Sequence, residues 1–252
     1  MRVYLKNRSL LYISGSDSES FLQSQLTNDI SKLGDSEIQI NAYCQHQGKI
    51  IGLFWVMRYQ NGFLISFPID LIEKIKSRLK MFIIMSDVVI EDFSNEFFQI
   101  GLIDEQNIDA YILNDSLSIM IADANNKKIT NFGNIEVWDK SYFDSSLPEI
   151  FSVTSEKLVP QMLNLDINEI GVNFSKGCYP GQEVVARLHY LGSAKRRLFS
   201  FQSDQEMQIG DSLYCATSKT ALARGDRYKG SGMVVSKVKY NSLFYCLATL
   251  DV

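Results

Sequence analysis

The sequence predicts an α+β fold that ends in a small all-β unit. Two observations support this prediction. Residues 37–104 combine strands of two-residue periodicity with an amphipathic helix, and short strands recur at hairpin spacing after Gly192. The chain has 252 residues, of which 46% are hydrophobic and 21% are charged, and this supplies enough apolar material for a packed core. With 4 prolines and 15 glycines, it is not a low-complexity chain.

A first helix is expected shortly after residue 16. The letters SDSE, Ser16 to Glu19, match the Ser-x-x-Glu capping box, so a helix should begin here and run to Leu26. It should end near Thr27 to Asp29, because short polar side chains favour turns over helix interiors.

Residues 37–104 are predicted to form one α+β unit, an antiparallel sheet covered by a helix. The stretch 37–44 alternates strictly, which is typical of a half-buried strand. Gln60 to Gly62 is a hairpin signal, and Pro68 before an amphipathic stretch indicates a helix start. The expected elements are strands at 37–44, 50–59, 63–67, 87–92 and 97–103 and a helix at 68–82.

From residue 105 onward the expected elements are short. Pro160 should open a short helix within 158–166, and a second helix at 182–190 should turn Val184, Val185 and Leu188 inward. A barrel or sandwich of about sixty residues follows. The expected strands lie at 117–122, 129–137, 196–202, 211–216, 232–240 and 243–251.

Charge is distributed unevenly along the chain. The net charge is −4, but residues 1–186 sum to −9 and residues 187–239 to +6. A basic segment behind an acidic body could face an anion such as a polyglutamate tail, a phosphate or RNA. For nucleic acid, we favour the simpler interpretation that a small β unit has a lysine-rich surface.

Neither a membrane span nor a signal peptide is recognisable. The longest apolar run, residues 50–57, is far too short to cross a bilayer, and no small-residue cleavage site follows the first apolar stretch. The four cysteines are widely spaced, without a CxxC pair, which favours reduced thiols over a disulfide framework. We therefore expect a cytoplasmic protein without membrane contact.

The stretch KGCYPGQEVVAR, residues 176–187, is the strongest candidate for chemistry. Tyr179 should be extended before its proline, and Gly181 should adopt a positive φ. Cys178 would lie just before a helix N-terminus with Lys176 close in sequence, and both favour the thiolate form. Glu183 could pair with Lys176 or accept from a ligand. This setting suits a reactive thiol or a metal-cluster contact, but from the residues alone a small buried hydrophobe remains the simpler interpretation of Cys178.

Other chemistries have less support. A Cys178–His189 nucleophile pair is conceivable, and Cys44 with His46 could complete a Cys₂His₂ set, but neither spacing is specific. No GxGxxG opens a helix after a strand, and no GxxxxGK followed by Ser or Thr occurs, so nucleotide binding is unsupported.

The same stretch resembles the Lys-Gly-Cys-(Tyr/Phe)-x-Gly-Gln-Glu signature of the YgfZ family, which is related to the aminomethyltransferase of the glycine cleavage system. FLQSQLTNDI near the N-terminus is similar to that family's F-x-Q-x-Q-x-T-x-D helix end, and CQHQGKI is similar to its C-x-x-x-G-K hairpin. VPQMLNLD and KRRL follow in the expected order, so the resemblance spans residues 12 to 198. Residues 105–150 and the C-terminal lobe are shorter than in that family.

The resemblance implies a three-lobed ring of two intertwined α+β lobes and a C-terminal β-barrel. The implied lobes are residues 1–36 with 105–190, a ferredoxin-like lobe at 37–104, and a barrel at 191–252. Tetrahydrofolate would bind near the centre, and the protein would serve the assembly or repair of iron–sulfur proteins, including cluster enzymes that modify tRNA. The implied partners are therefore folate and iron–sulfur client proteins, with a weak tRNA contact as a further candidate.

Site residues transfer from the resemblance by position. Cys178 and Lys176 take the functional roles, within a loop that also holds Gly177, Tyr179, Gly181, Gln182 and Glu183. Thr27, Asn28, Asp29 and Gln47 are the expected pterin contacts, and no metal ligand is expected. The glutamate tail of folate would meet the basic residues Arg187, Lys195, Arg196 and Arg197.

Two alternatives to the maintenance role remain open. One is a folate-dependent aminomethyltransferase, which would show turnover. The other is an interaction module in which the 176–183 loop binds a partner without a ligand.

Overall fold

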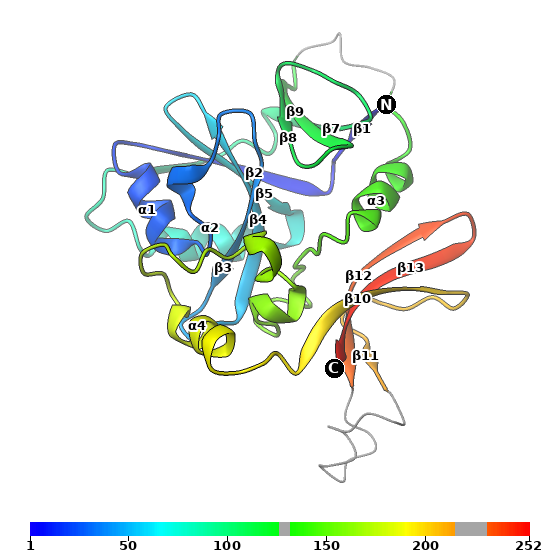
Figure 1. The fold of residues 1–252 in the computed structure, drawn as a ribbon. Helices are drawn as coiled ribbons and strands as arrows, with labels where there is room; N and C mark the ends of the chain where they lie inside the picture. The colour runs from blue at the N-terminus through cyan, green and yellow to red at the C-terminus, as the bar shows by residue number, and fades with distance from the viewer. Residues whose placement is uncertain (126–131, 215–230) are drawn as a thin grey trace.

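The computed structural model describes residues 1–125, 132–214 and 231–252. These residues form helices and three antiparallel sheets, as an α+β fold requires (Figure 1). One sheet lies at the top of Figure 1, the largest lies below and beside it, and the third lies at the lower right.

The largest sheet has five strands in the order β3-β4-β5-β2-β6. Its strand β4 reads IIGLFWVM and is buried from Ile50 to Met57, because both faces of the sheet are covered. The strands of this sheet are β2 (Arg8–Ser14), β3 (Gln39–Cys44), β4 (Ile50–Tyr59), β5 (Gly62–Pro68) and β6 (Val89–Asp92).

Strand β3 differs from its prediction because it is buried on both faces. Ala42, Tyr43 and Cys44 are each no more than 1% exposed, although they alternate between the two sides of the strand. Tyr43 stacks on Phe54, and Leu26 forms a bridge with Tyr43 along the outer edge of the strand. The prediction of a half-buried strand was therefore wrong in burial and right in position.

The first helix, α1 (Ser18–Gln25), forms where it was predicted but without the expected capping box. Its N-cap is Asp17 rather than Ser16, and no side chain caps it. Ser16 donates instead to the carboxylate of Asp87, and the Asp87 amide donates to Asp17. The capping side chains are thus used to tie the helix start to a distant loop.

The predicted helix at 68–82 is present as a 3₁₀ turn, η2 (Ile69–Leu71), followed by α2 (Ile72–Lys80). Pro68 ends strand β5 and is the N-cap residue of η2, so it lies at the helix start as predicted. Ile75 and Leu79 bury the inner face of α2 against the sheet, as the spacing predicted.

The second sheet has the order β1-β7-β9-β8, and helix α3 (Ile135–Asp144) packs against it. A side chain at Gly101 would place its Cβ 2.3 Å from the Trp138 ring, so this glycine permits close helix–sheet packing. The strands are β1 (Arg2–Tyr4), β7 (Phe97–Ile103), β8 (Ala110–Ile112) and β9 (Leu117–Asp123).

The prediction of a strand at 129–137 was wrong for the residues of that range that the structure describes. Residues 129–131 lie outside that part, and the helix α3 begins at Ile135. Asn134 caps this helix by accepting from the Glu136 amide, and Trp138 and Tyr142 bury one face of it. This Asn cap is the local signal that distinguishes the helix from a strand.

The third sheet has the order β10-β13-β12-β11, and α3 lies between it and the second sheet (Figure 1). Three strands occupy the predicted positions, while Cys215 and Ala216 of the predicted strand 211–216 lie outside the described residues. The strands are β10 (Arg196–Ser203), β11 (Ser212–Leu213), β12 (Gly232–Tyr240) and β13 (Leu243–Asp251). Closure into a barrel remains a prediction, as does the three-lobed ring.

The three predicted lobes also remain a prediction, but strand pairing crosses two of their boundaries. Strand β2, from the predicted first lobe, lies between β5 and β6 in the largest sheet. Strand β7, from the predicted 37–104 lobe, pairs with β1 and β9 in the second sheet. Contacts between these distant segments carry no local sequence signal.

Short helices connect the sheets. Helix α4 (Gln182–Tyr190) has the predicted bounds, but Val184 is 41% exposed and only Val185 is fully buried, so the inward orientation of Val184 was wrong. The 3₁₀ turns are η1 (Ile30–Lys32), η3 (Pro160–Leu163), which holds the predicted Pro160, and η4 (Ile167–Glu169). Across the parts of the chain that the structure describes, no helix is long and apolar enough to span a bilayer.

Candidate functional site

Three segments that are far apart in sequence meet at the candidate site. They are the end of helix α1 (residues 23–29), the hairpin turn between β3 and β4 (residues 45–48), and the 176–184 segment at the start of α4. Each contains one of the motifs found in the sequence, and the contacts between them are specific hydrogen bonds and close backbone packing.

Lys176 connects the third segment to the first. Its side chain is buried, and Nζ donates to the carbonyl oxygens of Gln23 at 2.6 Å, Leu26 at 2.5 Å and Asn28 at 2.9 Å. An ammonium group has three N–H donors, so all three are used. The prediction that Lys176 pairs with Glu183 was therefore wrong. Any effect of the Lys176 charge on Cys178 stays a prediction.

The environment of Lys176 opposes its positive charge. Burial lowers its pKa to about 8, while the carboxylate of Asp29 acts in the opposite direction. The ring of Tyr179 lies 5.5 Å from Nζ and adds a cation–π contact. A cation held in this way stabilises the 176–179 turn against the end of α1.

Thr27 and Asn28 have structural roles, because their polar groups are used inside the protein. Thr27 Oγ1 donates to the Gly171 carbonyl at 2.5 Å and accepts from the Ala42 amide at 2.8 Å. The Asn28 side chain donates to the carbonyls of Ile40 and Ile170 and accepts from the next amide. Their expected contacts with a pterin stay a prediction, but these hydrogen bonds leave little capacity for it.

Asp29 caps the turn η1. Its carboxylate accepts from the amide and hydroxyl of Ser31 and from the Gln23 side chain. These hydrogen bonds, led by the Ser31 hydroxyl, hold the pKa of Asp29 below its usual value. The carboxylate is therefore ionised and fixed in place.

Gly181 and Gly48 bring the third segment onto the hairpin turn. Gly181 has a φ of +85°, which confirms the predicted positive φ, and Gly48 has a φ of +75°. A Cβ at Gly181 would lie 2.4 Å from the Gln45 carbonyl oxygen and 2.7 Å from the Gly48 Cα. No side chain fits between these backbones, so both motifs require glycine here.

Cys178 lies between these two fixed points and is exposed. The alternative that it is a buried hydrophobe was therefore wrong. A Cβ at Gly177 would meet nothing within 4 Å, and its φ is not positive, so neither packing nor backbone conformation within the chain requires glycine there. Cys44 and Cys246 are buried instead, and burial raises the pKa of both thiols.

The histidines do not join Cys178 in a recognisable catalytic or metal site. Cys44 is buried, His46 is exposed, and His189 stacks on Phe174 with ring centroids 3.7 Å apart. Searching residues 1–125, 132–214 and 231–252 finds no group of three or more potential metal ligands. The Cys₂His₂ set was a sequence coincidence.

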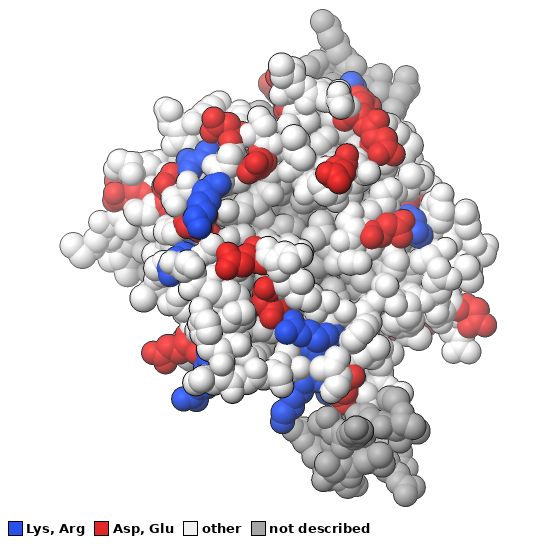
Figure 2. All heavy atoms as spheres, in the orientation of Figure 1, with Lys and Arg blue, Asp and Glu red and all other residues white. Residues whose placement is uncertain are grey.

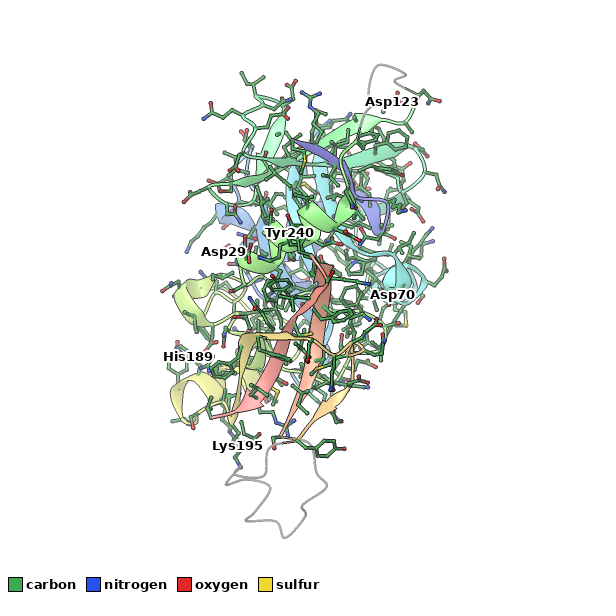
Figure 3. The ribbon with its side chains drawn as sticks, turned by 90° about the vertical axis from the view of Figure 1, so that its right-hand side faces the viewer. Asp29, Asp70, Asp123, His189, Lys195 and Tyr240 are labelled. Atoms are coloured by element: carbon green, nitrogen blue, oxygen red, sulfur yellow. The ribbon has the colours of Figure 1, made fainter. Side chains whose placement is uncertain are left out.

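The remaining predicted contacts lie on the surface. Gln47, Glu183 and Arg187 are exposed, and so is His189, which lies on the same side of the molecule as the buried Asp29 (Figure 3). None of them lines the hollow described below.

The predicted basic surface is partly neutralised by ion pairs. Arg197 binds Asp166 through two hydrogen bonds, of 2.5 and 3.0 Å, and Arg196 binds Asp251. Four further cations of the basic segment lie outside the described residues: Lys219, Arg224, Arg227 and Lys229. On the face drawn in Figure 2, acidic side chains are spread around a recessed centre.

A hollow of about 380 Å³ lies beside residues 28 and 29, which follow α1 and are hydrogen-bonded to three of its lining residues. Its walls combine apolar side chains with the polar groups of Glu37, Gln39 and Asn114. Gln39 donates to the Asp29 carbonyl and accepts from Asn41, which is fully buried. The lining residues are Glu37, Ile38, Gln39, Ile40, Leu113, Asn114, Ser145, Leu147 and Ile170.

The sequence did not indicate this hollow, because its walls come from four separate segments. An available signal was Asn41, an amide in the middle of the expected strand, where a buried polar group needs specific partners. Cys178 is not among the lining residues, so its predicted place at the mouth of the cavity stays a prediction.

The fold defines the class of protein. The structure is similar to the glycine cleavage system aminomethyltransferase T from Bartonella henselae, with a TM-score of 0.64. The match covers 99% of this chain and 78% of that one at 11% sequence identity. The chain therefore has an aminomethyltransferase T-like fold.

Sequence relatives add a more specific similarity. The chain is 29% identical to the tRNA-modifying protein YgfZ of Colwellia psychrerythraea, over 83% of this chain and 76% of the relative. It is 27% identical to the protein of the same name from an Enterobacter species, over 94% of this chain and 81% of that relative. A protein of Haemophilus influenzae is 29% identical, over 99% of this chain and 88% of that protein. No family model matches the chain. These relatives confirm the resemblance to the YgfZ family.

Proposed function

We propose that this chain is a cytoplasmic folate-binding protein that acts in the assembly or repair of iron–sulfur proteins, including cluster enzymes that modify tRNA. The relatives named tRNA-modifying protein YgfZ support the link to tRNA modification. The likeness of the fold to an aminomethyltransferase supports the choice of tetrahydrofolate as ligand. In this proposal Cys178 meets the client protein or its cluster.

The residues of the hollow fit a pterin ring. Its volume of about 380 Å³ lies within the range of small-molecule sites, roughly 300–1,000 Å³. Leu113, Leu147 and Ile170 provide apolar walls for a flat ring. The carboxylate of Glu37 and the amide of Gln39 can accept from and donate to the edge of an aminopyrimidine. Bound tetrahydrofolate would supply one-carbon carrier chemistry.

The folate tail has fewer basic contacts than the sequence indicated. Arg196 and Arg197 are held in ion pairs with Asp251 and Asp166, so Arg187 and Lys195 remain the proposed partners of the glutamate carboxylates. Both are exposed, which suits a tail that reaches solvent.

The observation that carries the proposal is the fixed presentation of Cys178. Lys176 and Gly181 hold the two sides of its turn, while the thiol and Gly177 between them face solvent. A structural cysteine needs no such support. A thiol that meets a partner does, because positioning before contact lowers the entropic cost of binding.

Calorimetric titration with tetrahydrofolate tests the ligand. We expect binding to the wild type and loss of binding in Ile170→Trp, whose indole would fill the hollow. Ile167→Trp is the matched control, because Ile167 is similarly exposed on the neighbouring turn η4 but does not line the hollow. A flat isotherm for the wild type at millimolar ligand would remove folate and leave a ligand-free interaction module.

A second assay separates the maintenance role from an enzyme. Purified chain incubated with formaldehyde and tetrahydrofolate should show binding without turnover. Catalytic transfer would instead make it an aminomethyltransferase. In cells that lack the chain, the activity of tRNA-modifying iron–sulfur enzymes should fall and should recover when the chain is restored.

A further inference from the structure

We infer that Lys176 is a positioning residue that couples the hollow to Cys178, so that a ligand in the hollow changes the accessibility of the thiol. This inference rests on the proposed function, because it takes tetrahydrofolate as the ligand. It assigns the lysine a mechanical role in addition to the electrostatic one that the sequence suggested.

On the helix side, Lys176 completes the C-terminus of α1. The last carbonyls of a helix lack partners within it, and cations are favoured there. Helix α1 has no basic residue in its last turn, and Lys176 supplies the missing cation from 153 positions away, donating to Gln23 and then to Leu26 and Asn28. The position of the 176–178 turn therefore depends on residues 23–28.

On the other side, the same short segment supports the wall of the hollow. The Asn28 side chain binds the carbonyls of Ile40, at 3.1 Å, and Ile170, at 3.3 Å, and both residues line the hollow. Gln39, a third lining residue, donates to the Asp29 carbonyl at 2.8 Å. A ligand that draws Gln39 or Ile170 inward acts directly on residues 28 and 29.

The two sets of contacts meet in one peptide segment. Its Asn28 carbonyl accepts from Lys176, while its Asn28 side chain and Asp29 carbonyl hold the wall. The segment is buried and densely bonded, so it shifts as a unit rather than absorbing a displacement. The 178 thiol is exposed at the far end of this connection, where a small movement changes its contact with solvent and partners.

The alkylation rate of Cys178 measures the coupling. We would use N-ethylmaleimide on a Cys215→Ser background, with ascorbate as reductant, since Cys44 and Cys246 are buried. Saturating tetrahydrofolate should change the rate by about fivefold or more, in the usual range of coupling between sites. Prior alkylation should also change the dissociation constant of tetrahydrofolate, but not by the same factor, because reciprocity holds for binding free energies and not for rates.

Variants test the role of Lys176. Lys176→Met keeps an unbranched side chain, one heavy atom shorter, and removes its donors, so the effect of tetrahydrofolate on the rate should disappear while calorimetry still detects binding. Lys157→Met, at an exposed lysine, should behave as the wild type. If Lys176→Met does not fold, Lys176→Gln retains a side-chain amide with two N–H donors and should show a reduced effect.

The outcomes are distinguishable. Binding of tetrahydrofolate with an unchanged alkylation rate in the wild type would overturn the coupling and leave the proposed function standing. A ligand effect that persists in Lys176→Met would overturn the assignment of Lys176. Absence of binding would overturn both the coupling and the folate proposal.

Discussion

The ammonium group of Lys176 lies 2.6 Å from the carbonyl oxygen of Gln23, a residue 153 positions earlier in the chain. This contact joins the two longest motifs of the sequence, the Gln-rich end of α1 and the Lys-Gly-Cys turn. It shows that both motifs belong to one structural unit, and it explains why a lysine precedes the exposed cysteine.

Lys176→Met should destabilise the protein by about 3 kcal/mol. The change removes the donors of three buried carbonyl groups and the cation at the end of α1. Urea unfolding at neutral pH measures the loss. Lys157→Met should stay within about 0.5 kcal/mol of the wild type, as is usual for exposed substitutions. Equal stability of the two variants would show that the buried lysine contributes nothing to the fold.

Asp139→Asn should stabilise the protein at pH 7.5 by about 1–3 kcal/mol. Burial, followed by the carboxylates of Glu149 and Glu136, raises the pKa of Asp139 to about 6, while Arg8 opposes the shift. Its folded-state pKa thus lies above the unfolded value of 3.8, so the folded protein binds more protons between these values. The contribution to stability is fully present below pH 3.8 and is lost as the pH rises through 6.

The prediction for Asp139→Asn can be checked by measuring its stability relative to the wild type at two pH values. The advantage of Asp139→Asn should shrink as the pH falls from 7.5 to 5 and the wild-type carboxyl becomes protonated. Asp109→Asn, at an exposed aspartate, should show no such trend. A constant advantage at both pH values would mean that the carboxylate is not buried in solution.

Local signals predicted much of the fold. The hairpin signal at Gln60 to Gly62, the amphipathic spacing of Ile75 and Leu79, and the Pro-Gly turn before α4 all act within a few residues, and the structure contains each of these elements. Strand pairing between β2 and β5 or between β7 and β1 depends on contacts across many residues, and no local pattern encodes it.

The features of the candidate site also fall into two groups, those set by local sequence and those set by contacts between distant segments. The positive φ of Gly181 follows from turn chemistry, which is local, whereas the residues alone favoured a buried Cys178 and the structure exposes it. The partners of Lys176 and the lining of the hollow depend on segments brought together by the sheets. The sequence therefore indicated the segments that meet at the candidate site, but not the carbonyl groups to which Lys176 donates.

Replacement by alanine should have unequal effects on stability at two glycines of the same turn. Gly181→Ala should cost about 2 kcal/mol or more, because its φ is +85° and its Cβ would lie 2.4 Å from the Gln45 carbonyl oxygen. Gly177→Ala should change stability by less than about 0.5 kcal/mol, since its Cβ meets nothing. Thermal unfolding of the pair measures the difference, and similar losses at both positions would contradict the packing.

The same pair tests whether a partner approaches the turn. If a client protein approaches the backbone at Gly177 closely, Gly177→Ala should lower the recovery of tRNA-modifying enzyme activity in cells while the purified variant remains as stable as the wild type. Full recovery of that activity would show that no partner needs the space above Gly177.

Cys178→Ala should leave stability within about 0.5 kcal/mol of the wild type and abolish function in cells, because the thiol is exposed and makes no core contacts. Cys246→Ala is the matched comparison. Its thiol is buried in the third sheet, so the change should cost about 1 kcal/mol through the cavity it leaves. Alkylation followed by peptide mapping adds a direct test, since Cys178 should react in the folded protein and Cys44 and Cys246 only after unfolding. A large loss of stability in Cys178→Ala, or protection of its thiol in the folded state, would return Cys178 to a structural role and remove the basis for its contact with a client.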